Sequence, residues 1–260
     1  MQGASGVIAL VLAETAAGGA AVLWLTPLWG SVKRGFFVLT TAVLAACAAA
    51  AAASASAARV PGGDADVAIL LAWITTGILA LSLLALALRR LTAGRWLGLA
   101  SVPLGIGLLV ALAGLAEPGQ LPALVQLAAG AAFMGAATDG LLLGHWYLVD
   151  RGLDRAHIKR LALVLIGAVG VEAVALIVGG ARGDVAPTEG FSPFLTVGGG
   201  AIYMTIVLGM VGLTALIAVL IHLALREPRP RAVQAATGFF YLAVITAFTA
   251  ELAAKVRFLG

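Results

Sequence analysis

Charged residues and cysteine are both scarce in this sequence of 260 residues. Only 11% of the residues are Asp, Glu, Lys or Arg and 62% are hydrophobic, whereas a soluble domain has about 25% charged residues. This composition excludes an ordinary soluble domain and predicts a polytopic membrane protein. The single cysteine, Cys47, excludes an intrachain disulfide and a cysteine-based metal cluster.

The motifs of common soluble enzymes are also missing. The sequence has no phosphate-binding P-loop, no HExxH, no CxxC and no GxSxG. On the side of the membrane that has fewer basic residues, the longest segment between apolar runs extends from Gly180 to Pro193. This segment is too short for a soluble domain. A lipid-modifying enzyme could use Asp150 and Asp154 as metal ligands, but an ordinary salt-bridged loop is the simpler interpretation of this mixed-charge segment.

Long apolar runs are the main feature of the sequence. A helix needs about 20 apolar residues to cross the hydrocarbon core, and open sheet edges do not persist in lipid. The fold class is therefore predicted to be all-α, with about eight transmembrane helices in one transmembrane domain, residues 1–260. The expected spans are 5–29, 35–58, 67–88, 96–116, 121–149, 159–179, 195–224 and 233–254.

Positive charge is distributed unevenly between the two sides that these spans define. Twelve of the 16 lysines and arginines lie in or next to the loops that follow odd-numbered spans, which are all on one side of the membrane. The other four lie on the opposite side. Because cytoplasmic loops carry an excess of Lys and Arg, we expect both termini to be non-cytoplasmic, in an inner or cytoplasmic membrane. The N-terminal run has no basic residues before it, so we interpret it as a first membrane helix rather than a cleaved signal peptide. The excess positive charge indicates topology and not nucleic-acid binding.

The two halves of the chain show a weak internal similarity. A shift of 122 positions places Gly18 on Gly140 and Trp24 on Trp146. This favours a parallel repeat with halves 1–117 and 118–260, which would form two four-helix bundles. Chance similarity between helices rich in Ala, Leu and Gly is the alternative.

Four acidic residues lie within the apolar spans. Glu14, Asp139 and Glu172 are each expected within about 6 Å of a span midpoint, from a rise of about 1.5 Å per residue. No lysine or arginine is expected at that depth, so the three carboxyls could form one acidic layer in which some are protonated. Intramembrane carboxyls are candidates for proton relay, and hydrogen bonding between helices is the structural alternative. Glu251 differs, because Lys255 four residues later predicts a local ion pair near the outer boundary.

Two histidines are expected near the cytoplasmic ends of spans. His145 and His222 would lie at similar depth on different helices, where they could ligate a haem b iron. His145, with Trp146 beside it, could instead contact a quinone head group. The simplest alternative is an interfacial histidine that reaches water, and an aromatic belt position for Trp146.

Three functions are compatible with these features. The first is a membrane subunit of a respiratory or other energy-converting complex, which binds quinol or haem near the cytoplasmic edge and handles protons with buried carboxylates. The second is a proton-coupled transporter or channel, and the third is a membrane scaffold. Each would have the lipid bilayer around it, and the first and third would have other protein subunits as partners.

Overall fold

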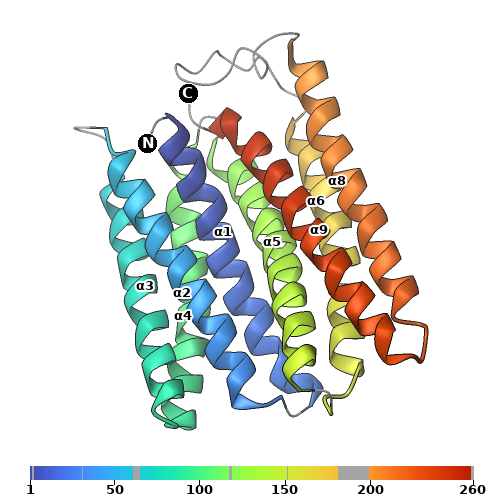
Figure 1. Ribbon diagram of the computed structural model, residues 1–260. Helices are drawn as coiled ribbons and strands as arrows, with labels where there is room; N and C mark the ends of the chain where they lie inside the picture. Colours follow the sequence, from blue (N-terminus) through green and yellow to red (C-terminus); the bar gives the residue numbers. More distant parts are fainter. Residues whose placement is uncertain are drawn as a thin grey trace.

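The computed structural model describes residues 1, 3–30, 32–60, 65–116, 119–150, 152–180 and 199–258. These residues form eight long helices and two short 3-10 helices, and no strand occurs among them (Figure 1). All eight helices are long and apolar enough to cross a membrane. The predicted all-α polytopic membrane fold is therefore confirmed.

The helix bounds follow the predicted spans closely. The elements are α1 (Gly3–Leu25), η1 (Thr26–Trp29), α2 (Arg34–Ala57), α3 (Asp66–Ala87), α4 (Leu91–Ala113), α5 (Gln120–Val149), α6 (Ala156–Gly180), α8 (Gly199–Ala224), α9 (Pro230–Lys255) and η2 (Val256–Phe258). The first predicted span is divided because Pro27 lies in the 3-10 turn η1, after α1 has ended. The seventh predicted span began at residue 195, and residues 195–198 lie outside the described residues.

The helices pack as two groups of four. In the first group α1 contacts α2, α2 contacts α3, α3 contacts α4, and α4 returns to α1. In the second group α5 contacts α6, α6 contacts α8, α8 contacts α9, and α9 returns to α5. The groups meet mainly along α1 and α5, the two central helices in Figure 1. This arrangement is compatible with two four-helix bundles, and their origin as a repeat stays a prediction.

Glycine lets the two groups approach closely. A Cβ atom at Gly18 of α1 would lie 1.7 Å from the carbonyl oxygen of Ala131 on α5. A Cβ atom at Gly135 would lie 2.3 Å from the carbonyl carbon of Gly18. Backbone therefore packs on backbone here, as is typical of membrane helices whose interfaces carry small residues.

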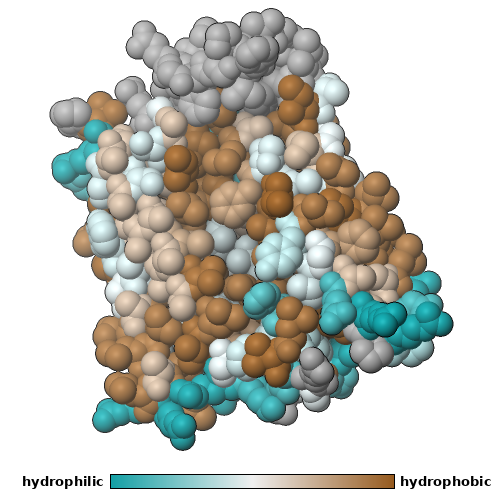
Figure 2. All heavy atoms as spheres, viewed as in Figure 1, coloured by the Kyte–Doolittle hydropathy of each residue, from teal (hydrophilic) through white to brown (hydrophobic). Residues whose placement is uncertain are grey.

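The surface agrees with a position in lipid. Large apolar side chains are exposed along the outer helices, among them Leu70, Trp73, Val174 and Leu216. Figure 2 shows apolar residues over most of the visible face and hydrophilic residues gathered toward the ends of the helices. α1 begins and α9 ends on the same side of the molecule, as an even number of crossings requires (Figure 1).

Candidate functional site

A cluster of charged side chains is buried between the two helix groups. Its centre is Lys255 of α9, whose Nζ atom lies 2.8 Å from Oε1 of Glu14 on α1 and 2.8 Å from Oε2 of Glu251 on α9. The side chains of Lys255 and Glu14 are fully buried, and that of Glu251 is 1% exposed. One ammonium group therefore joins α1 of the first helix group to α9 of the second.

The local ion pair predicted for Glu251 and Lys255 is present. The expectation that no basic residue would reach Glu14 is wrong. Lys255 was expected near the outer boundary, but the chain stays inside the protein at the end of α9, where Val256 and Phe258 of η2 are also buried. The ring centroid of Phe258 lies 5.3 Å from Nζ of Lys255, within cation–π distance.

Gly130 on α5 makes room for the carboxylates. A Cβ atom there would lie 2.7 Å from Oε1 of Glu14 and 2.9 Å from Oε2 of Glu251. Any larger residue would press on both acids at once. α5 thus contributes to the site through the absence of a side chain, a contribution that sequence reasoning missed.

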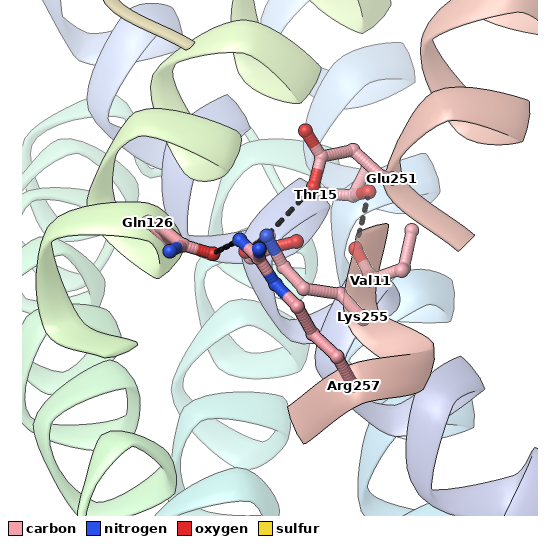
Figure 3. Close-up of polar contacts among 7 residues, drawn as sticks. Val11, Thr15, Gln126, Glu251, Lys255 and Arg257 are labelled. Carbon is pink, nitrogen blue, oxygen red and sulfur yellow. Dashed lines mark hydrogen bonds and ion pairs between the residues drawn. The ribbon is translucent and has the colours of Figure 1, made fainter. Parts of the chain in front are cut away.

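Further polar residues extend the cluster. Glu172 of α6 is fully buried and close enough to interact electrostatically with Glu251 and Lys255. Gln126 of α5 is also buried, and its side-chain oxygen accepts a hydrogen bond from Arg257 of η2. Figure 3 shows Arg257 facing Gln126, with Lys255 beside it and Glu251 on the neighbouring turn of α9. Three carboxyls and two basic groups therefore share this site, which we call the acid–lysine cluster: Glu14, Glu172, Glu251, Lys255 and Arg257.

Asp139 stands apart from the cluster. It lies on α5 nine residues after Gly130, which is about 13 Å along the helix. Its side chain is fully buried, and neither carboxyl oxygen has a hydrogen-bond partner among the described residues. The predicted acidic layer therefore separates into the acid–lysine cluster, which includes Glu14 and Glu172, and a solitary Asp139.

The predicted cofactor ligands lie outside this cluster. His145 is exposed, and its Nδ1 atom lies 3.4 Å from the hydroxyl of Tyr241 on α9. His222 is half-buried on α8. Since α5 and α8 each contact both α6 and α9, the two histidines belong to helices at opposite corners of the second group. Haem ligation by His145 and His222 stays a prediction.

Trp146 and the Asp150 loop have structural contacts. A Cβ atom at Gly35 of α2 would lie 2.1 Å from Cη2 of Trp146, so the indole lies directly against the α2 backbone. Asp150 accepts a hydrogen bond from Nζ of Lys33 at 3.0 Å. Asp154 accepts one from the backbone N–H of Ala156 at 2.9 Å. These contacts fit the salt-bridged loop interpretation, with Lys33 as the basic partner.

Sequence reasoning missed Lys255 as a partner of Glu14, and it missed Gln126 and Arg257 altogether. The available signal was the run from Glu251 through Lys255 to Arg257, which places three ionisable residues at the end of an apolar segment. Searches of protein-family models, of curated proteins and of solved structures found no match to the chain.

Proposed function

We propose that the protein moves protons across the membrane, as a proton transporter or channel, and that the acid–lysine cluster holds the transported proton. The observation that carries the proposal is the burial of Lys255 between Glu14 and Glu251, with Glu172 beside them. Ionisable groups at such positions are costly in a membrane and mark ion or proton paths.

Charge balance supports a bound proton. If every group in the cluster were ionised, its three carboxylates would outnumber its two cations by one. An uncompensated charge in a low-dielectric interior costs several kcal/mol. The neutral arrangement is reached when one proton is shared among the carboxyls, and a group that holds a proton in this way can also release it.

The position of the ion pair links proton binding to helix packing. Lys255 and Glu251 both belong to α9, whereas Glu14 belongs to α1. A proton on Glu14 would cancel the attraction between these two helices and leave Lys255 paired within α9. Protonation would thereby weaken one contact between the helix groups, the kind of bias that alternating access requires. Asp139, about 13 Å from Gly130 along α5, would serve as a second proton position.

A second candidate is the membrane subunit of an energy-converting complex. His145 and the Tyr241 hydroxyl form an exposed pair at 3.4 Å, and both can hydrogen-bond a quinone carbonyl. A subunit with this role would use the acid–lysine cluster for the protons of quinol chemistry. Oxidised and reduced absorption spectra, with lipid extraction for quinone, test this candidate: a Soret band lost in His145→Ala or His222→Ala establishes haem.

The proposal includes the orientation of the protein in the membrane. The ends that carry Lys33, Arg89, Arg155 and Arg226 would face the cytoplasm by the positive-inside rule. The termini and the acid–lysine cluster would then lie toward the non-cytoplasmic side of an inner or cytoplasmic membrane.

Proton flux into proteoliposomes tests the main proposal. A pH-sensitive dye inside the vesicles reports acidification of the lumen. Protons are driven inward by an outward potassium gradient, whose diffusion potential makes the lumen negative. Wild-type protein should acidify the lumen faster than protein-free vesicles, and Glu14→Gln and Glu172→Gln should abolish the difference. Glu227→Gln, at an exposed carboxyl, should leave the flux unchanged. Wild-type flux equal to that of empty vesicles, or equal flux in all variants, would overturn the proposal.

A further inference from the structure

A cavity of about 420 Å³ lies at the opposite, arginine-rich end of the first helix group. Its lining includes Trp24, Arg34, Phe37, Leu86, Leu91 and Arg95. Its size is within the usual range for small-molecule sites, about 300–1,000 Å³. Trp24 lies ten residues after Glu14, about 15 Å along α1, so the cavity is separate from the acid–lysine cluster. The proposed proton function uses none of its lining residues.

Two arginines supply the only charges among the described lining residues. Arg34 opens α2, and its Nη1 atom donates hydrogen bonds to the carbonyl oxygens of Leu86 at 2.8 Å and Ala87 at 3.0 Å, at the end of α3. These contacts fix one edge of the guanidinium. Its remaining N–H groups have no partner in the described part of the chain, so they are available to an anion.

The start of α4 adds to the positive potential. Leu91, Arg95 and Gly98 lie at positions i, i+4 and i+7, so they share one face of this helix. The first turn of α4 contains no acidic residue, and no side chain caps it. Its unpaired backbone N–H groups and the helix dipole therefore favour an anion near Leu91.

Trp24 forms an aromatic wall of the cavity and packs against α4. Its side chain is 7% exposed, and its indole N–H has no hydrogen-bond partner among the described residues. A Cβ atom at Gly98 would lie 2.5 Å from Nε1 of Trp24, which puts the indole N–H edge against the α4 face that carries Arg95. The other surface of the indole stacks on Phe37, with ring centroids 5.5 Å apart.

We infer that this cavity binds a phosphate-bearing amphiphile. Arginine guanidinium groups match phosphate oxygens with paired hydrogen bonds, so Arg34 and Arg95 would hold the phosphate. Pro27, Val32, Phe37 and Leu86 also line the cavity, and their apolar side chains suit the first carbons of an acyl or prenyl chain. The volume admits a phosphate head and the beginning of a chain, while the rest of the chain would lie in the surrounding lipid.

Binding of three matched probes tests the inference. Full-length protein in an uncharged detergent is titrated with dihexanoyl phosphatidic acid, with dihexanoylglycerol and with inorganic phosphate, and tryptophan fluorescence or calorimetry gives the Kd. Phosphatidic acid should bind at least about tenfold more tightly than either of the others, because only it has both the phosphate and the chains. If inorganic phosphate binds as tightly as phosphatidic acid, the ligand is a soluble phosphate compound and the inference of an amphiphile is wrong.

Three variants locate the site. Arg95→Gln should weaken phosphatidic acid binding by about tenfold or more, as expected for a lost charge-assisted hydrogen bond. Trp24→Phe keeps an aromatic ring stacked on Phe37 and removes no charge, so it should weaken binding by less. Arg226→Gln removes an arginine at the same end but outside the cavity, and binding should not change. If Arg226→Gln weakens binding as much as Arg95→Gln, the attraction is general surface charge and the inference fails. Wild-type affinity in Arg95→Gln would also overturn it.

Discussion

Replacement of Lys255 by Met should destabilise the protein by about 3–5 kcal/mol, the usual cost of removing one partner from a buried ion pair. Two contacts of 2.8 Å are lost at once. At an effective dielectric constant of about 20, each is worth about 6 kcal/mol of Coulomb attraction before desolvation is subtracted. The Met side chain is similar in length to that of Lys and leaves no large cavity, so the change in stability should reflect the loss of the charge. Glu14 and Glu251 would remain buried beside each other.

Unfolding in mixed micelles of dodecyl maltoside and sodium dodecyl sulfate, followed by circular dichroism, measures this change. Lys33→Met is the matched control, since Lys33 also pairs with a carboxylate, at 3.0 Å, but its side chain is 72% exposed. The control should lose less than about 1 kcal/mol. Adding Glu14→Gln and Glu251→Gln to Lys255→Met should recover much of the stability, because no buried charge is then left unpaired among these three residues. A loss below about 1 kcal/mol in Lys255→Met alone would refute the charged arrangement of the cluster.

Three further predictions concern packing, Asp139 and orientation. Gly130→Ala should destabilise by about 1–3 kcal/mol in the same unfolding assay, because its Cβ would press on two carboxylates, whereas Gly170→Ala, with open space around it, should be neutral or slightly stabilising. Asp139→Asn should leave stability unchanged or raise it, since no described partner is lost, and a large loss would show that the carboxylate has a structural partner. With Cys47 replaced by Ser, a cysteine introduced at Arg226 should react with an impermeant maleimide in inside-out vesicles and not in right-side-out vesicles; the opposite pattern would reverse the proposed topology.

The helices could be predicted from the sequence because hydrophobic length is a local property. Pro61, Gly119, Gly180 and Pro228 fall between apolar runs, and each run is about as long as the hydrocarbon core is thick. Such signals need no knowledge of which helix contacts which. The bounds consequently agree within a few residues over most of the chain.

The partners of the buried acids could not be predicted in the same way. The i, i+4 spacing of Glu251 and Lys255 made their pair visible, but the contact between Glu14 and Lys255 joins residues 241 positions apart. That contact depends on how α9 and η2 enter the protein beside α1. It also depends on Gly130, whose role is visible only when the neighbouring carboxylates are in place.

The same tertiary arrangement explains how so much charge is tolerated in an apolar protein. α1 and α5 approach closely through Gly18 and Gly135, which draws the two helix groups together and keeps lipid away from their interface. Lys255 then enters from α9 and reaches an acid on α1 that would otherwise be unpaired. The interface thus depends on two kinds of contact: close packing of small residues, which does not depend on protonation, and an ion pair, which does. A protein with only the first kind of contact would be a passive scaffold, whereas the proposed proton function requires the second, because only the ion pair would change when a proton binds.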